Sequence, residues 1–249
     1  MSDKIEGYLG ITKEKKKSRM PAKLDFYQSA TGVVLALFIA FHLIFESSIL
    51  IGKDAMMWMT KMFELDFIIE GGTPVFITLL AMFIFTVFII HAGLAMRKFP
   101  SSYREYMRFI ESAKNLKHPD TDLWFLQIIT GFIMFFIGSV HLYIIMTQPG
   151  NVGPYLSSDR IYSDMMWPGY LVLMVSVVIH ASVGVYRLII KWGWLDFDNP
   201  KANRAKNRKI IKIVAIFYLI IGALSLMSYM KIGYEHRDHY GERYIGEHK

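Results

Sequence analysis

Five long apolar runs constrain this chain more than any other feature of its sequence. They cover approximately residues 24–50, 74–96, 123–147, 167–190 and 210–231. Crossing about 30 Å of hydrocarbon takes roughly 20 helical residues, and each run is long enough to do so. Within a bilayer only helices and closed barrels satisfy every backbone polar group, and runs of this length favour helices. The sequence therefore predicts one all-α integral membrane domain over residues 1–249, a bundle of five transmembrane helices with polar tails at 1–20 and 233–249.

The basic residues predict how this bundle is oriented. Twenty-one of the 28 Lys and Arg residues lie in 1–23, 97–122 and 187–212, and seven lie in the other polar segments. Because basic loops stay on the cytoplasmic side, we expect a cytoplasmic N-terminus. The first run is too long for the apolar part of a signal peptide and is expected to span. Membrane topology thus accounts for the net charge of +7, and no nucleic-acid partner is expected.

The chain contains no cysteine, which limits the chemistry it can support. Disulfides, thiolate zinc sites, cysteine-ligated iron–sulfur clusters and covalently attached c-type haem are all excluded. We find no dinucleotide-binding, P-loop, serine-hydrolase or zinc-protease motif, and no internal repeat. Any redox cofactor must therefore use histidine, methionine or a non-covalent pocket.

Four of the eight histidines lie inside the first four apolar runs, one in each: His42, His91, His141 and His180. The other four lie in polar segments, where we expect solvated surface positions: His118, His236, His239 and His248. Taken singly, an intramembrane histidine can equally serve as a hydrogen-bonding residue between helices.

Depth in the membrane groups the four intramembrane histidines into pairs. His42 and His141 both lie about 27 to 28 Å along outward-running helices, toward the outer side. His91 and His180 both lie about 9 to 10 Å before the cytoplasmic ends of inward-running helices. A bis-histidine haem needs one nitrogen on each face of its iron, from neighbouring helices at equal depth. We therefore predict two haems b, a distal one on His42 and His141 and a proximal one on His91 and His180.

Small and charged residues accompany these histidines. Arg187 and Lys191 could pair with haem propionates or extend to the cytoplasmic surface. Glu46 lies one turn beyond His42 on the same helix face, and we predict that it handles protons or tunes the distal haem. A carboxylate that simply reaches interfacial water is the alternative. Small residues that could admit a flat macrocycle or allow tight helix packing lie on the faces of the last two histidines: Gly131, Gly138, Ser176 and Gly184.

Several strings with these histidines in place identify a family resemblance: KSRMPAKLDFYQSATG, FELDFIIEGGTP, HAGLAMRKFP, GSVHLYIIMTQP and HASVGVYRLIIKWGW. Over roughly residues 18–235 the chain resembles the dihaem cytochrome b anchor of quinol:fumarate reductases and succinate:quinone reductases, in the form with one anchor polypeptide. The resemblance implies the same four haem ligands, paired as depth predicts.

The resemblance also implies further site residues. The quinol-site acid falls on Glu64, and a residue near the distal haem falls on Arg160. Some relatives carry a glutamate two residues before the fourth histidine that is thought to move protons, and here that position is Val178. Positions that contact the propionates of the proximal haem fall on Gln28, Ser29, Trp124 and Lys191.

An electron relay in the bacterial cytoplasmic (inner) membrane is the function that the resemblance implies. Menaquinol would be oxidised near the distal haem, and electrons would pass by the proximal haem to an iron–sulfur subunit on the cytoplasmic side. That subunit would supply an FAD-containing flavoprotein that reduces fumarate to succinate, and the reverse direction uses the same parts. A wide lipid-facing surface permits a dimer of the complex.

Two alternatives remain open at this stage. The chain could be the cytochrome b subunit of a hydrogenase, formate dehydrogenase or nitrate reductase, which copurifying subunits would distinguish. It could also be a proton-coupled transporter that uses its histidines as relays. Paired histidine depths and the lack of broken helices or an inverted repeat argue against the transporter.

Overall fold

The computed structural model describes residues 19–99, 102–116, 119–194 and 199–246, and these form helices and connecting turns with no strand. Five of the described helices are long and apolar enough to cross a membrane. The predicted all-α bundle of five spanning helices is thereby confirmed. They are α2 (Met20–Glu46), α4 (Val75–Met96), α6 (Pro119–Thr147), α8 (Trp167–Trp192) and α9 (Pro200–His236).

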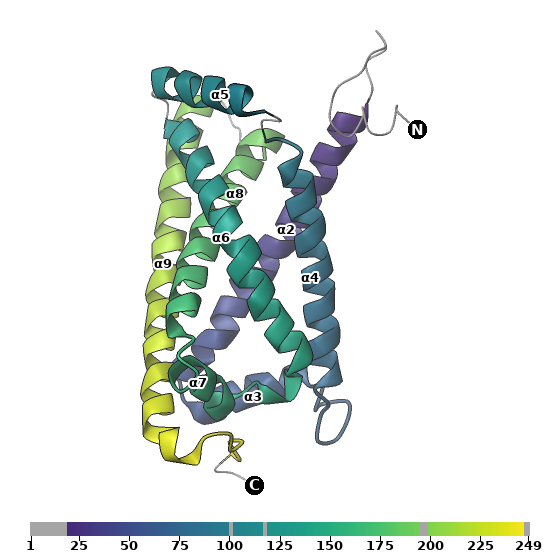
Figure 1. Ribbon diagram of the computed structural model, residues 1–249, viewed down its shortest axis with the longest axis vertical. Coiled ribbons are helices and arrows are strands. Elements are labelled where there is room, and N and C mark those ends of the chain that lie inside the picture. Colours follow the sequence, from purple (N-terminus) through teal and green to yellow (C-terminus); the bar gives the residue numbers. More distant parts are fainter. Residues whose placement is uncertain (1–18, 100–101, 117–118, 195–198, 247–249) are drawn as a thin grey trace.

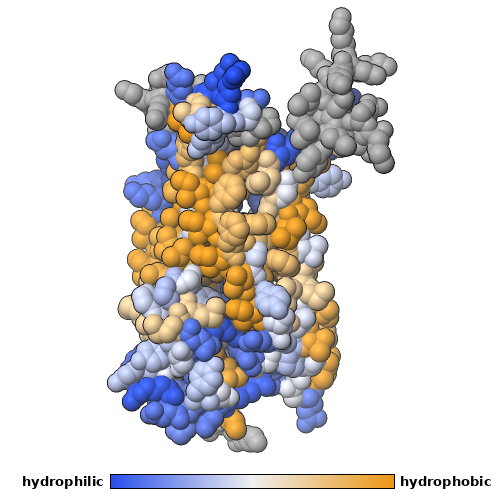
Figure 2. Space-filling view, in the orientation of Figure 1, coloured by the Kyte–Doolittle hydropathy of each residue, from blue (hydrophilic) through white to orange (hydrophobic). Residues whose placement is uncertain are grey.

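Four of these helices close into a ring. Helix α2 packs on α4, α4 on α6, α6 on α8, and α8 again on α2, while α9 lies along α8 and also touches α2 (Figure 1). The ring consists of the four helices that carry the intramembrane histidines. On the face shown in Figure 2, apolar side chains form a band across the middle of the molecule and hydrophilic residues gather at both ends, as expected for a surface that faces lipid.

Helix α9 extends past both ends of its apolar run. It has 37 residues, or about 55 Å at the rise of an α-helix, which exceeds the roughly 30 Å of hydrocarbon in a bilayer. The Asn199 side chain caps its start by accepting from the Ala202 backbone N–H at 3.1 Å. Its last turn lies within the expected polar tail 233–249, whereas residues 1–18 and 247–249 lie outside the described part of the chain.

Three shorter helices, which the sequence analysis did not anticipate, lie at the ends of the bundle. Helices α3 (Lys53–Phe63) and α7 (Pro154–Tyr162) lie with the C-terminus at one end, and α5 (Tyr103–Leu116) lies at the other (Figure 1). We call these the α3/α7 end and the α5 end. Helix α7 packs directly on α9. Gly233 permits this contact because it has no side chain: an added Cβ would lie only 2.5 Å from the Ser158 carbonyl oxygen.

Candidate functional site

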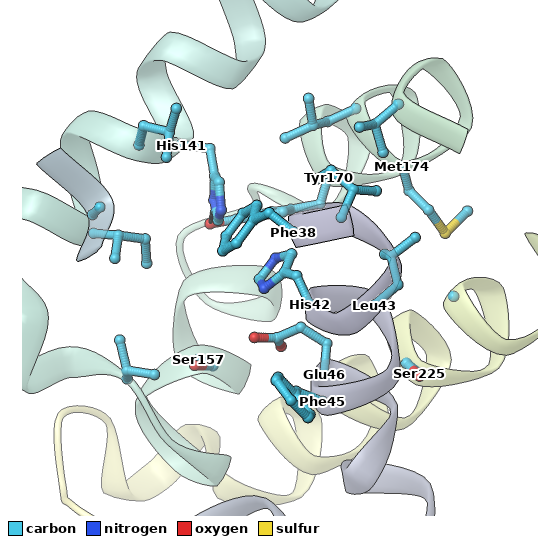
Figure 3. A pocket seen from close by; sticks show the side chains of 18 of the residues that line it. Phe38, His42, Leu43, Phe45, Glu46, His141, Ser157, Tyr170, Met174 and Ser225 are labelled. Atoms are coloured by element: carbon cyan, nitrogen blue, oxygen red, sulfur yellow. Dashed lines mark hydrogen bonds between the residues drawn. The ribbon is translucent and has the colours of Figure 1, made fainter. Parts of the chain in front are cut away.

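A cavity of about 600 Å³ lies inside the bundle toward the α3/α7 end, and mostly apolar side chains line it. His42 of α2 and His141 of α6 project into it (Figure 3). Their ring centroids are 6.2 Å apart and the ring planes are tilted by 46°. The structure thus brings together the two histidines that depth in the membrane groups as the distal pair.

Polar groups line the same cavity beside the two rings. The Tyr170 hydroxyl lies 3.4 Å from His141 Nδ1. Glu46 extends into the cavity next to His42 (Figure 3) and accepts a 3.0 Å hydrogen bond from the Tyr229 hydroxyl. Arg160 of α7 is 7% exposed, hydrogen-bonds Tyr170, and also lines the cavity. Two predicted site residues, Glu46 and Arg160, therefore line the same cavity as the distal histidine pair.

Glu64 lies beside this cavity and is not among the residues that line it. It follows α3, is 1% exposed, and comes one turn after Thr60, which does line the cavity. Each carboxylate oxygen has a cationic partner: Lys61 Nζ lies 2.8 Å from Oε2 and an Arg243 guanidinium nitrogen 2.7 Å from Oε1. The structure therefore presents the predicted quinol-site acid as a buried carboxylate with two ion pairs at the edge of the cavity.

The second histidine pair lies toward the α5 end. His91 of α4 and His180 of α8 are close enough to interact electrostatically. Each ring lies against a glycine of a neighbouring helix. A Cβ added at Gly32 would lie 3.1 Å from His91 Cε1, and one at Gly131 would lie 3.0 Å from His180 Cε1. Only glycine therefore leaves room for these rings without displacing them.

Hydrogen bonds fix the tautomer of His180. Its Nδ1 lies 2.9 Å from the backbone carbonyl oxygen of Gln127. A carbonyl can only accept, so Nδ1 carries the proton. The Thr130 hydroxyl lies 3.4 Å from the same nitrogen and donates to the Leu126 carbonyl oxygen at 2.7 Å, so it too accepts from the ring. The lone pair of Nε2 is then free for a metal ion.

His91 is held in the same way on α2. The Thr31 hydroxyl lies 3.1 Å from His91 Nδ1 and donates its own proton to the Tyr27 carbonyl oxygen at 2.8 Å. The ring also hydrogen-bonds the backbone of Gln28. Metal-binding histidines typically donate their second ring N–H to such an acceptor, which fixes the ring and makes its free nitrogen more basic. The donor set at this end therefore fits a haem iron held between two imidazoles.

These contacts come from a short pattern that occurs twice, Gln-x-x-Thr-Gly followed ten residues later by His. The copies occupy residues 28–42 and 127–141, so the expectation that the chain lacks an internal repeat is wrong for this pattern. In each copy the Thr and Gly hold a histidine of the α5-end pair, while the His belongs to the distal pair. Sequence reasoning missed the threonines, although the equal spacing of the two copies could have identified them.

A cluster of cations gathers at the α5 end around Asp25. Arg97 hydrogen-bonds its carboxylate, and Lys98 and Lys191 lie 3.1 and 3.5 Å from it. Lys191 also donates to Ser29 Oγ at 3.2 Å. Burial lowers the pKa of Lys98, while its contact with Asp25 acts in the opposite direction. Three cations around one carboxylate leave excess positive charge, which suits an anionic group such as a haem propionate.

The remaining predicted propionate contacts lie on the helices of this end. Gln28 Oε1 is buried without a hydrogen-bond partner, which leaves an acceptor ready for a protonated group. Arg187 donates to the side-chain oxygen of Gln127 at 2.8 Å, beside the carbonyl that binds His180. Trp124 of α6 packs edge-to-face on Phe125 with ring centroids 5.2 Å apart. The backbones of Gln28 and Gln127 thus contact the α5-end histidines, and Arg187 binds the side chain of Gln127.

The prediction of a surface position for His236 is wrong, since this residue is only 7% exposed. Its Nδ1 lies 3.1 Å from Asp159 Oδ1, and its ring stacks on Tyr155 with centroids 3.9 Å apart. The error arose because the polar composition of 233–249 suggested a tail, whereas α9 continues and Gly233 lets it approach α7. His239 is exposed as expected, while His118 and His248 lie outside the described residues.

Comparison with known proteins places this architecture in a family. Residues 111–221 match the model of the succinate dehydrogenase/fumarate reductase transmembrane subunit. The fumarate reductase cytochrome b subunit of Wolinella succinogenes is 53% identical over 234 residues, covering 94% of this chain and 91% of that protein. Two subunits with the same description from Helicobacter pylori strains J99 and 26695 are 43% and 42% identical, each covering 94% of this chain and 90% of its own length. The chain therefore belongs to the succinate dehydrogenase/fumarate reductase transmembrane subunit family.

Proposed function

We propose that this chain is the cytochrome b membrane subunit of a fumarate reductase, which oxidises menaquinol and passes electrons to an iron–sulfur subunit, or works in the reverse direction. The observation that carries the proposal is the convergence of His42 and His141 on one cavity, in a chain 53% identical to a fumarate reductase cytochrome b subunit. The descriptions of these relatives favour fumarate reductase over a hydrogenase or formate dehydrogenase partner.

His42 with His141, and His91 with His180, would each hold one haem b. When bound there, haem supplies one-electron transfer between the two ends of the bundle. The chain's own contribution is to fix the rings, since backbone carbonyls and threonine hydroxyls hold the Nδ1 protons of His91 and His180. Histidines locked in one tautomer can ligate iron but cannot pass protons through both ring nitrogens, which favours this function over a proton-coupled transporter.

The quinol would react beside the distal pair. Oxidation of one quinol releases two electrons and two protons, so the site needs a base within reach of the quinol hydroxyls. Glu64, at the edge of the cavity, is the proposed proton acceptor. Glu46 inside the cavity is the second candidate, and its hydrogen bond from Tyr229 holds it beside His42. Val178, buried in α8, cannot accept a proton.

The charge distribution supports a sidedness for the chain, and the family and the descriptions of its relatives support its partners. The α5 end would face the cytoplasm of a bacterial inner membrane, because the basic segments meet there. It would carry the iron–sulfur subunit and, through it, the FAD-containing flavoprotein that reduces fumarate. The apolar band seen in Figure 2 would face lipid, and part of this surface would be available for a dimer of the complex.

A spectrum of the purified chain tests this function. A reduced-minus-oxidised spectrum should show b-type haem, and a haem assay should give about two haems per chain, one for each histidine pair. The intact complex should couple menaquinol oxidation to fumarate reduction. A chain purified without any b-type absorbance would contradict the proposal, and copurification with hydrogenase subunits would redirect it to another quinone-linked enzyme.

Replacing Thr31 by valine should raise the midpoint potential of one haem. The substitution keeps the side-chain shape but removes an acceptor for His91 Nδ1–H, which makes the imidazole a weaker electron donor to the oxidised iron. A hydrogen bond of about 1 kcal/mol corresponds to a shift on the order of 40 mV for one electron. A redox titration measures the shift, and Thr86→Val is the matched control because Thr86 is exposed and bonds only its own helix. Equal titrations for both variants would remove Thr31 from this role.

A further inference from the structure

The last described residues, Arg237–Gly246, form a segment that lies across the α3/α7 end, which we call the C-terminal strap. Its anchors are hydrogen bonds to carboxylates. The Tyr240 hydroxyl donates to Asp164 at 2.9 Å, and the Gly241 backbone N–H donates to Asp159 at 2.9 Å. The hydrogen bond to the Asp164 carboxylate raises the pKa of the Tyr240 hydroxyl, as expected for a donor to an anion.

Beyond these two anchors, Tyr244 fastens the strap to α3. Its hydroxyl donates to Asp54 Oδ1 at 2.7 Å, and its side chain is almost fully buried. Arg243 therefore lies between two fixed points, the Gly241 backbone and the Tyr244 ring. Because the backbone is held on both sides of Arg243, forming an ion pair there costs less conformational entropy.

Arg243 donates a hydrogen bond to Glu64, although it lies 179 positions later in the chain. Among the described residues, the charged groups in contact with Glu64 are Arg243 on the strap and Lys61 on α3. Glu64 is 1% exposed, whereas the side chain of Arg243 is 43% exposed. An ionised carboxylate removed from water in this way is strongly disfavoured unless cations and hydrogen bonds compensate it, so loss of either partner leaves a buried charge without full compensation.

We propose that the C-terminal strap supplies Arg243 as a positioning residue for Glu64, which holds this carboxylate ionised at the edge of the cavity until it takes a proton from the quinol. This inference rests on the proposed role of Glu64. The oxidation takes two such steps. In each, one O–H bond of the quinol breaks, one O–H bond forms on Glu64, and one electron leaves toward the iron–sulfur subunit. Glu64 returns each proton to water before it takes the next one, and the ion pair with Arg243, whose side chain is 43% exposed, then forms again.

The test is the pH dependence of menaquinol oxidation by the intact complex carrying Arg243→Gln. A carboxylate that has lost a cationic neighbour holds its proton more tightly, so the acid limb of the rate profile should move upward by about 1 to 3 pH units. Arg243→Lys should restore part of the shift, because lysine keeps the charge but not the fork geometry. Arg237→Gln is the matched control: it removes an exposed arginine of the same strap that pairs with Asp238, and its profile should equal that of the wild type.

The outcomes separate this inference from the function on which it rests. If Glu64→Gln stops quinol oxidation while Arg243→Gln keeps the wild-type profile, Glu64 retains its role and the inference is wrong. If Glu64→Gln oxidises quinol at the full rate, the proposed role of Glu64 and the inference about Arg243 are both wrong. Should Arg243→Gln fail to assemble with haem, Tyr244→Phe decides, because it loosens the strap without changing a charge. A shift of its acid limb to higher pH supports the inference, and an unchanged limb overturns it.

Discussion

Glu64→Gln is expected to slow menaquinol oxidation by a factor of roughly 10² to 10⁴, the usual contribution of a positioned acid or base. Glutamine fills the same space, but it cannot accept a proton from the quinol. Haem content and fumarate reduction with a soluble artificial electron donor should stay unchanged, because neither needs the quinol site. The measurement is a comparison of the two activities in one preparation of the complex.

Two further variants sharpen this experiment. Glu70→Gln removes an exposed acid from the same α3–α4 connection and should leave quinol oxidation unchanged. Glu46→Gln alters the acid inside the cavity. If quinol oxidation stops in Glu46→Gln and persists in Glu64→Gln, the proton acceptor is Glu46. If Glu46→Gln leaves turnover, the distal haem potential and its pH dependence unchanged, Glu46 has neither of its predicted roles.

His141→Ala is expected to remove one of the two proposed haems, leaving about one per chain, because a haem iron held by two histidines would lose one of its two protein ligands. The proposed pairing predicts which double variants lose one haem and which lose two. The double variant His42→Ala with His141→Ala should lose no more haem than either single variant. Combining His141→Ala with His91→Ala should instead remove both haems. Haem assays and redox titrations of the purified complex provide the measurement.

The exposed His239 provides the control, since its replacement by alanine should leave the haem content unchanged. A different pattern of losses would contradict the pairing. If His141→Ala together with His91→Ala retained one haem, while His42→Ala together with His141→Ala lost both, the ligands would be paired across the depths assigned here. Thermal unfolding of each variant separates loss of haem from loss of the fold.

The spanning helices could be predicted from sequence because length and apolar content decide them almost alone. A run of roughly 20 apolar residues has few alternatives in a bilayer, and equal depth then groups the histidines. Helices α3 and α7 were not predictable in this way. They have 11 and 9 residues, and their polar composition resembles that of a loop, so their position depends on packing against other helices.

Contacts between distant segments account for most of what the sequence analysis missed. Nothing near Glu64 in the chain indicates that Arg243 binds it, and nothing near His236 indicates Asp159 as its partner. Both pairs form because α9 continues beyond its apolar run and carries the C-terminal strap across the α3/α7 end. The Gln-x-x-Thr-Gly pattern is different, because it is local and repeated, so it could have been found in the sequence.

The repeated pattern also fixes how far apart the two histidine pairs lie. On α2 and again on α6, the glycine that accommodates a ring of the α5-end pair precedes a distal histidine by ten residues. Ten residues of α-helix rise about 15 Å, and this length does not depend on loops, lipids or neighbouring subunits. The distance that each electron must cross between the proposed haems is therefore set by the hydrogen-bond geometry of two continuous helices. Changes in the connecting segments can alter the partners of this protein without lengthening that transfer.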